Sequence, residues 1–365
     1  MTGIRIHWRI IGILLALPLV LSAQTGAGKY PDGLYAEVLT SKGLIVLQLE
    51  YQKTPMTAAN FVGLAEGTIQ NAAFPLGIPF FNGTKFHRVA PGHVIQTGIA
   101  PNGKSAGPGY EFPNEIRLPE LSHGRAGMLN MANSGPHTNA SQWCITLGDR
   151  SYLDGDYTVF GHVVQGMDVV FAIVQGDEIK SIKIVRAGEA AGKFRPTTES
   201  FQKMVEQARA RVQAEEQKRK IAEEKAIQAK YPNARNVENG IRFVVVREGR
   251  GDIPAAGAKM RVAYSGKTLG GVEFASTADA GSPYFGSKAE AFEMEAGRKT
   301  PQINRGFDAM VAQMKQGEKR TLIIPGNQAY GVPGFYGKEV PGRKRFHISP
   351  NATLIYEVEA LEILK

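Results

Sequence analysis

Two groups of residues in this sequence have the types and spacing to do chemistry. The first is polar: Arg88 and Gln96 lie in the motif FHRVAPGHVIQTG, residues 86–98. An arginine presents a permanently charged fork of hydrogen-bond donors, and a glutamine both donates and accepts. The second group is aromatic and lies beyond residue 260, where such rings form either a plain hydrophobic core or a dry binding cage. Neither group requires a metal or a cofactor, and we expect neither.

Other candidate motifs carry less weight. Cys144 is the sole cysteine, which excludes an internal disulfide. Gly103, Gly107 and Gly109 imitate a phosphate-binding loop, but we expect no helix after them and reject a phosphate site. The chain also lacks the combined aromatic and basic pattern of a nucleic-acid module, so we do not expect nucleic acid as a partner.

The length and the first residues bear on domain number and on targeting. A chain of 365 residues is too long for one core and predicts two or three domains. Arg5 and Arg9 precede an apolar run at residues 10–21 that is too short to span a bilayer, and Ser22-Ala23 supply small residues for cleavage. This pattern predicts a secretory signal peptide at residues 1–23 and no stable membrane span after its removal.

Charge and glycosylation motifs refine the expected location. Removing two arginines with the signal peptide leaves 43 − 2 = 41 basic and 34 acidic residues, a net charge of +7. Asn139 begins an Asn-X-Ser/Thr triplet, and a glycan attached there would block a motif described below. Export to a bacterial periplasm therefore fits better than a eukaryotic secretory route, in which such triplets are glycosylated.

A charged segment at residues 191–232 separates two globular regions. Thr197 or Thr198 can cap the start of a helix, and Tyr231 stands before Pro232, where a helix is expected to stop. At about 1.5 Å per residue, a helix over residues 198–230 would be roughly 50 Å long, wider than a small domain. We interpret it as a linker helix that sets a distance.

The two halves of the predicted helix differ in pattern. In the first half an apolar face is expected to dock on a domain; its residues are Phe201, Met204, Val205, Ala208 and Val212. In the second half Glu215, Arg219 and Glu223 are spaced four apart, which supports a solvent-exposed helix. The alternative is a homodimer through the helix, although its apolar seam is short for a coiled coil.

Residues 30–190 read as many short apolar runs separated by Gly, Pro and Asn, which favours a barrel or a sandwich. Four ordered motifs resemble the cyclophilins: FHRVAPGHVIQTG, then GPGYEFPNE, MANSGPHTNASQWCI and LDGDYTVFG. The resemblance implies a closed antiparallel β-barrel with two capping helices. It also implies peptidyl-prolyl cis-trans isomerase activity.

The reaction itself needs no nucleophile. Rotation about an X-Pro bond meets a barrier of about 20 kcal/mol because the nitrogen lone pair is delocalised. A guanidinium that donates to this nitrogen localises the lone pair, while an apolar pocket holds the ring. By resemblance Arg88 is catalytic and Gln96 is its partner. The implied substrate-binding residues are His93, Val94, Ala132, Asn133, Cys144, Leu153 and Tyr157.

Several of these positions depart from the family pattern. His93, Val94 and Cys144 replace larger apolar residues, Tyr152 stands at the usual Trp, and Tyr157 stands at a frequent His. We therefore expect a smaller or wetter pocket. Weakened isomerase activity and poor cyclosporin binding are the implied consequences.

The second region, residues 233–365, is predicted to be α+β, with one short helix at 306–316 against an antiparallel sheet. Its motifs VAYSG, VEFAST and INRGFDAM resemble the FKBP family, whose dry aromatic cage favours a twisted amide. The implied cage residues are Tyr264, Phe274, Phe292, Ile303, Phe307, Tyr330, Ile348 and Tyr356. The backbone N–H of Asn304 is the implied donor to a substrate carbonyl. Ala275, in place of the usual acid, and a basic cluster after residue 337 are departures.

Together the two regions predict an exported peptidyl-prolyl isomerase of dual family. Its expected partners are unfolded or partly folded proline-containing proteins of the envelope or secreted proteins. One alternative is a non-catalytic chaperone or clamp that holds prolyl segments. Another is that only the C-terminal half catalyses, because more pocket positions are retained there.

Overall fold

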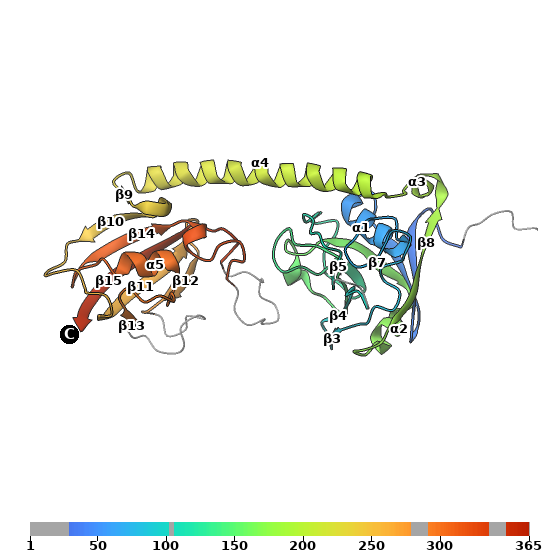
Figure 1. Cartoon of the computed structure of the whole chain (residues 1–365), viewed down its shortest axis with the longest axis horizontal. Coiled ribbons are helices and arrows are strands. Elements are labelled where there is room, and N and C mark those ends of the chain that lie inside the picture. Colours follow the sequence, from blue (N-terminus) through green and yellow to red (C-terminus); the bar gives the residue numbers. More distant parts are fainter. Residues whose placement is uncertain (1–28, 102–105, 279–290, 336–347, 365) are drawn as a thin grey trace, which may run out of the picture.

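A computed structural model describes residues 29–101, 106–278, 291–335 and 348–364. Two separate sheets lie beneath one long helix, α4, which runs across both (Figure 1). The predicted signal peptide and the basic cluster after residue 337 lie outside the described residues. Among the helices of the described residues, none combines the length and apolar character needed to cross a membrane.

The first domain is an antiparallel sheet in the order β3-β4-β6-β5-β7-β2-β1-β8. Its first hairpin turns at Gly43, whose positive φ of 138° suits glycine. The strands are β1 (Gly33–Thr40), β2 (Gly43–Leu49), β3 (Arg88–Ala90), β4 (Val94–Thr97), β5 (Met128–Met131), β6 (Trp143–Thr146), β7 (Val159–Gln165) and β8 (Ile179–Ala187).

The expected closed barrel is wrong: the sheet is curled, and its end strands β3 and β8 do not pair as a ladder. Because β3 has only three residues, the chain before it meets the start of β8 through irregular backbone. Gly83 N donates to Ile179 O at 2.7 Å, and Phe86 N donates to Asp177 O at 2.8 Å. Isolated backbone hydrogen bonds therefore join the two edges of the sheet along a seam, in place of a regular strand pair.

Helix α1 (Pro55–Glu66) fills the curled sheet, and its Phe61 packs against Trp143, with ring centroids 5.7 Å apart. Pro55 opens the helix and Gly67 closes it in the left-handed conformation. The remaining helices of the domain are α2 (Met167–Ala172), α3 (Gly188–Gly192) and the 3-10 turn η1 (Ser151–Leu153).

The second domain is an antiparallel sheet in the order β12-β11-β15-β14-β10-β9, with β13 paired to β11. Its strands are β9 (Arg235–Asn236), β10 (Arg242–Arg247), β11 (Lys259–Thr268), β12 (Glu273–Ser276), β13 (Phe292–Glu295), β14 (Lys319–Ile324) and β15 (Leu354–Leu364). Helix α5 (Arg305–Val311) packs against it, and the 3-10 turns are η2 (Glu238–Gly240) and η3 (Gly326–Gln328).

Helix α5 ends five residues earlier than the predicted 316. After Val311 the chain turns toward β14, and Gly317 takes a positive φ of 78°. The Glu318 carboxylate accepts a hydrogen bond from Lys315 N at 2.8 Å, which holds this turn. The Lys315 N–H therefore bonds to a side-chain carboxylate and not to a backbone carbonyl of a longer helix.

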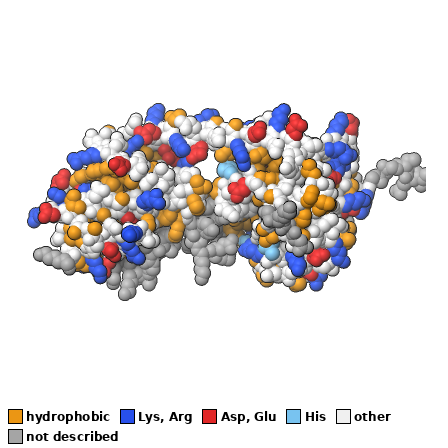
Figure 2. All heavy atoms as spheres, in the orientation of Figure 1, with side chains coloured by type: hydrophobic (Ala, Val, Ile, Leu, Met, Phe, Trp, Pro, Cys, Tyr) orange, Lys and Arg blue, Asp and Glu red, His pale blue; other side chains and the backbone are white. Residues whose placement is uncertain are grey.

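Helix α4 (Thr198–Lys230) has the bounds that the sequence predicts. Thr197 caps it through a reciprocal pair of bonds with Ser200. Phe201 is buried against Phe112 of the first domain, with ring centroids 5.7 Å apart, as expected for the apolar face. Figure 2 shows charged side chains of both signs along the side of the molecule that α4 forms.

The second half of α4 is not fully solvent-exposed, which corrects the prediction. Ile227 is 7% exposed and packs with Ile323 and Ile355 of the second sheet. The prediction failed because the polar partners of α4 are distant in sequence: Arg242 Nη2 lies 2.7 Å from Glu224 Oε2. The helix is therefore anchored to both domains.

Candidate active sites

The first site is built on a row of side chains that crosses four strands. Arg88 on β3 faces Gln96 on β4, Gln96 faces Cys144 on β6, and Cys144 faces Asn130 on β5. Directly opposed residues of an antiparallel ladder project to the same side of the sheet. The register therefore brings together three residues that the sequence assigned to one site.

Hydrogen bonds orient this row. Arg88 Nη1 donates to Gln96 Oε1 at 3.4 Å, and Gln96 Nε2 donates to Gln142 Oε1 at 2.8 Å. This hydrogen bond to a neutral amide limits the rotamers of the guanidinium. Gln142 was not among the predicted residues; its place two residues before Cys144 in MANSGPHTNASQWCI was the available signal.

Cys144 can line the site, but its thiol is not a nucleophile. It is buried, and burial raises the pKa of its thiol to about 12, against an opposing effect of the Arg88 charge. The thiolate, which is the reactive form of cysteine, is therefore absent at neutral pH. The arrangement fits non-covalent chemistry.

Two loops border the row. Ala132 N donates to Gln142 O at 3.0 Å, so the predicted substrate-aligning segment lies beside the glutamine. Asn133 Nδ2 donates to Asp156 O at 2.9 Å, which ties this segment to the loop carrying Leu153 and Tyr157. Leu153 is buried in η1, whereas Tyr157 is half-buried.

A histidine holds the loop that carries Leu153 and Tyr157. His123 Nδ1 lies 2.7 Å from Asp154 Oδ1, and His123 N donates to the same oxygen at 2.8 Å. His123 was not a predicted site residue. The predicted His93 lies in the turn between β3 and β4 and contacts Tyr152, with ring centroids 6.2 Å apart. Val94 is buried on β4, two residues before Gln96.

The second site is an aromatic cluster that the fold assembles from β11, β12, β13, β15 and α5. Tyr264 lies 5.0 Å from Phe307, and Phe307 lies 4.9 Å from Tyr356, between ring centroids. Phe274 packs against Tyr356 at 5.7 Å, and Phe292 packs against Tyr264 at 6.3 Å. The structure thus brings together five of the predicted cage residues.

The other predicted members lie around this cluster. Tyr330 packs against Phe335 in a tilted arrangement, with ring centroids 5.1 Å apart, and Phe335 pairs through its backbone with the buried Ile348. Ile303 is partly buried against the same core. Burial raises the pKa of Tyr264, Tyr330 and Tyr356, so all three phenols stay protonated at neutral pH. The cage therefore offers hydroxyl donors and no titrating acid or base.

A glycine makes close approach of the rings possible. A Cβ at Gly266 on β11 would lie 2.7 Å from the Phe274 ring and 2.9 Å from the Tyr356 ring. Real Cβ atoms do not approach other atoms so closely. The glycine of VAYSG is therefore part of the cage wall.

Asn304 has a side-chain role beyond its predicted backbone role. Its Oδ1 accepts from Phe307 N at 2.9 Å, which caps α5, and its Nδ2 donates to the Tyr356 hydroxyl at 2.8 Å. The Asp308 carboxylate takes the N–H groups of Gln302 and Ile303. The role of the Asn304 N–H as donor to a substrate carbonyl stays a prediction.

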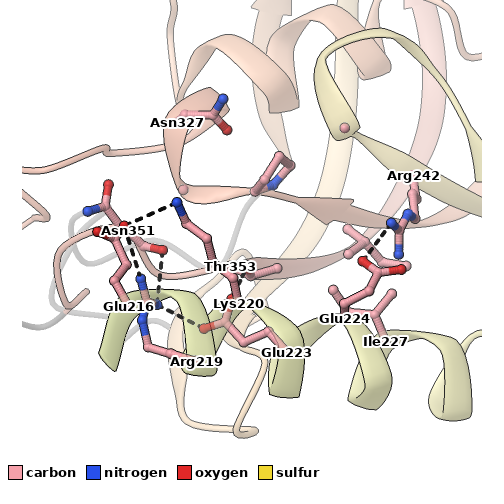
Figure 3. A pocket seen from close by; sticks show the side chains of 14 residues that line it. Glu216, Arg219, Lys220, Glu223, Glu224, Ile227, Arg242, Asn327, Asn351 and Thr353 are labelled. Carbon is pink, nitrogen blue, oxygen red and sulfur yellow. Dashed lines mark hydrogen bonds and ion pairs between the residues drawn. The ribbon is translucent and has the colours of Figure 1, made fainter. Parts of the chain in front are cut away.

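A groove of about 340 Å³ lies between α4 and the second domain, apart from both sites (Figure 3). Arg219 Nη1 donates to Glu223 at 2.9 Å and to Asn351 O at 3.4 Å, and Thr353 donates to Glu223 at 2.9 Å. Because these groups satisfy one another, we interpret the groove as a polar seam that fixes the helix.

Comparison with known proteins identifies both halves. The family model described as "Cyclophilin type peptidyl-prolyl cis-trans isomerase/CLD" matches residues 35–189. The model described as "FKBP-type peptidyl-prolyl cis-trans isomerase" matches residues 251–361. The two matches fall on the two sheets and leave α4 between them.

Curated relatives resemble the first half. A "Probable peptidyl-prolyl cis-trans isomerase A" of Mycobacterium bovis is 43% identical over 133 residues, 35% of this chain and 72% of that protein. "Peptidyl-prolyl cis-trans isomerase-like 1" of Homo sapiens is 37% identical over 167 residues, 43% of this chain and 92% of that protein. A crystal structure of a cyclophilin-type isomerase from Cryptosporidium parvum is 26% identical, covers 42% of this chain and 98% of that one, and has a TM-score of 0.37.

Proposed function

Because the chain belongs to the peptidyl-prolyl cis-trans isomerases, with a cyclophilin-type and an FKBP-type domain, we propose that it is an exported folding assistant. Its substrates would be X-Pro bonds in envelope or secreted proteins. The observation that carries the proposal is that two unrelated folds with one activity occur in a single chain. Such a pairing is useful where prolyl isomerisation limits the folding of many different clients.

In the first site, the proposed mechanism is donation to the prolyl nitrogen. Arg88 lies in a row with Gln96 and Cys144, and Gln142 fixes the glutamine. A guanidinium held in this way can donate to the nitrogen as its lone pair localises in the twisted amide. Donation favours the transition state over the planar ground state, which is the requirement for catalysis.

In the second site, the proposed mechanism is binding in a dry cage. A twisted amide has less charge separation than a planar one, so removal of water favours the twisted form. The packed rings of Tyr264, Phe307 and Tyr356 supply that surface. The Asn304 N–H would hold a carbonyl outside the rotating bond.

A protease-coupled isomerase assay on an X-Pro tetrapeptide tests the catalytic claim. We expect Arg88→Ala and Phe307→Leu to lower kcat/KM partially, and the double variant to lose about 10- to 100-fold. Arg211→Ala on α4 and Phe171→Ala on α2, both exposed, are matched controls that should match the parent protein. A double variant with the parent's rate contradicts the assignment of both sites.

Export is supported by residues 1–23, whose pattern is that of a signal peptide. Expression of the full chain in a Gram-negative host, followed by fractionation and N-terminal mass determination, tests it. We expect a periplasmic product that has lost about 23 residues. A cytoplasmic product that retains the first residue contradicts export.

A second role, holding clients, is favoured by the double anchoring of α4. Two prolyl sites at a fixed separation raise the effective concentration of one site for a client bound at the other. Suppression of client aggregation that survives the combined Arg88→Ala and Phe307→Leu changes would favour holding over turnover. Loss of suppression in that double variant would instead tie protection to the sites.

We also propose a homodimer through α4, which would have to form without the apolar face that the first domain covers. The first domain already covers Phe201 and Val205, so a partner helix would have to use other residues of α4 or displace that domain. Light scattering of the full chain distinguishes the monomer mass from twice that value.

A further inference from the structure

One side of the second site is formed by two stretches of chain, residues 326–335 and 348–353, which we call the outer wall. Tyr330 and Phe335 pack against the core of the second domain. Phe335 N donates to Ile348 O at 2.9 Å, and Ile348 N donates to Phe335 O at 3.0 Å. The outer wall therefore holds two predicted cage residues, Tyr330 and Ile348, on paired backbone.

The two stretches of the outer wall also pack backbone against backbone near α4. Asn351 N donates to Gly331 O at 2.8 Å, and Gly331 N donates to Gly326 O at 2.8 Å. A Cβ at Gly326 would lie 2.4 Å from the carbonyl carbon of Asn351, which is closer than real Cβ atoms approach. Because Gly331 follows Tyr330 directly, a displacement of Asn351 is transmitted to a cage residue.

Two side chains of α4 hold this backbone, and Figure 3 shows them pointing toward it. Arg219 Nη1 donates to Asn351 O at 3.4 Å and to Glu223 Oε1 at 2.9 Å. The other oxygen of the same carboxylate accepts from Thr353 Oγ1 at 2.9 Å. Hydrogen bonds that involve an ionised group are stronger than bonds between neutral groups. One arginine–glutamate pair thus holds the outer wall at two points.

We propose that Arg219 and Glu223 are positioning residues of the second prolyl site, which hold its outer wall through Asn351 and Thr353. The proposal rests on the proposed function of that site. The linker helix then does more than set a distance, because it fixes a surface against which the peptide binds. That surface serves the planar and the twisted peptide alike, so loosening it weakens binding and leaves turnover at saturation nearly unchanged.

The test uses the full chain with Arg88→Ala, so that the second site supplies the turnover. Exchange NMR of an X-Pro peptide over a range of concentrations separates KM from kcat. Arg219→Ala and Glu223→Ala should each raise KM about 2- to 10-fold. The same variants should change kcat by less than about twofold. A KM equal to that of the Arg88→Ala chain in both variants overturns the proposal.

A neighbouring lysine on α4 provides the matched control. Lys218 is exposed and forms no ion pair within the part of the chain that the structure describes. Lys218→Ala removes a positive charge from the same helical turn and should leave KM unchanged. If KM rises as much as in Arg219→Ala, the effect comes from charge alone and the proposal fails.

A double variant decides whether the two contacts act as one unit. Thr353→Val removes the hydroxyl that donates to Glu223. Combined with Glu223→Ala, it should raise KM no further than Glu223→Ala alone, because the hydroxyl acts through the carboxylate. Additive increases in KM contradict this linkage. Arg219→Lys keeps the charge but loses the planar fork of donors, so it should restore part of the affinity lost in Arg219→Ala.

Amide hydrogen exchange without peptide tests the outer wall independently of the proposed function. The amides of Phe335, Ile348 and Asn351 donate within the outer wall and should exchange about threefold faster or more in Arg219→Ala. Unchanged exchange at these amides overturns the proposal. If the Arg88→Ala chain neither binds nor turns over the peptide, the proposed function of the second site fails, whereas the exchange rates still decide the role of α4. Loss of protection throughout β15 would mark unfolding, and the milder Arg219→Lys variant then decides.

Discussion

A buried histidine makes the first domain sensitive to acid. Burial lowers the pKa of His123, which is 1% exposed, despite the opposing hydrogen bond with the Asp154 carboxylate. Partial burial is also the largest cause lowering the pKa of the half-buried His87 and His162. Below pH about 6.5 the unfolded chain binds protons that the folded chain excludes. Stability from these residues is therefore present above that pH and is lost as pH falls toward the lowered folded values.

In the variant His123→Gln, an amide that cannot titrate replaces the imidazole near Asp154. The parent's thermal midpoint should fall between pH 7.5 and 5.5, and the variant's should fall less, since each unit of pKa difference is worth about 1.4 kcal/mol. Calorimetry at three pH values measures both slopes. Identical slopes would show that His123 does not contribute.

Gly266 lies in the wall of the aromatic cage of the second site, where no side chain fits. Gly266→Ala should force the Phe274 and Tyr356 rings apart, lower stability by about 1–3 kcal/mol and reduce isomerisation by the second site. Gly270→Ala is the matched control, because its Cβ would meet only Thr268 Oγ1 at 3.8 Å. Urea unfolding and the isomerase assay in the Arg88→Ala chain measure the two effects. An unchanged Gly266→Ala protein would remove the glycine from the cage.

Sequence motifs brought the candidate site residues to attention because the motifs are local, but they did not show how these residues pair. Arg88 and Gln96 come from one motif, and a short hairpin places them opposite each other. The bond from Asn304 to Tyr356 joins residues 52 positions apart, and no local pattern announces it. Likewise, Glu115 accepts a hydrogen bond from Thr57 N at the start of α1, 58 positions away, while Thr54 at the N-cap position makes no side-chain cap bond.

Among the elements, the bounds of α4 depend on nearby residues, whereas its burial depends on residues distant in sequence. Its bounds followed from the Thr197 cap and the Tyr231-Pro232 stop, both of which act within a turn. Its environment did not, because Glu224 and Ile227 find partners on β10, β14 and β15. A charged pattern with four-residue spacing fits both a solvated helix and a helix that docks through ion pairs.

Two isoleucines on α4 provide a matched test of this docking. Ile227→Ala should destabilise the second domain or its contact with α4 by about 2–4 kcal/mol, because Ile227 is 7% exposed. Ile221→Ala should change stability by less than about 0.5 kcal/mol, because Ile221 is 61% exposed. Paired spin labels on the two domains would show a broader distance distribution for Ile227→Ala alone. Equal distributions in both variants would contradict docking by this residue.

At the scale of the whole molecule, the closed barrel was the largest error of prediction. The sequence order of the strands was compatible with closure, but the register and the three-residue length of β3 leave a seam of irregular backbone. Chain-wide pairing depends on contacts between residues far apart in sequence. The row containing Arg88 begins at that edge of the sheet, because β3 is the end strand.

We expect both prolyl isomerase sites of this chain to be active. Exchange NMR at equilibrium tests this most directly, because cis-trans interconversion of an X-Pro peptide is observed without a coupling protease. The full chain should accelerate exchange, Arg88→Ala and Phe307→Leu should each retain part of the acceleration, and the double variant should approach the uncatalysed rate of once per tens to hundreds of seconds. A double variant that exchanges the peptide as fast as the parent would contradict the account.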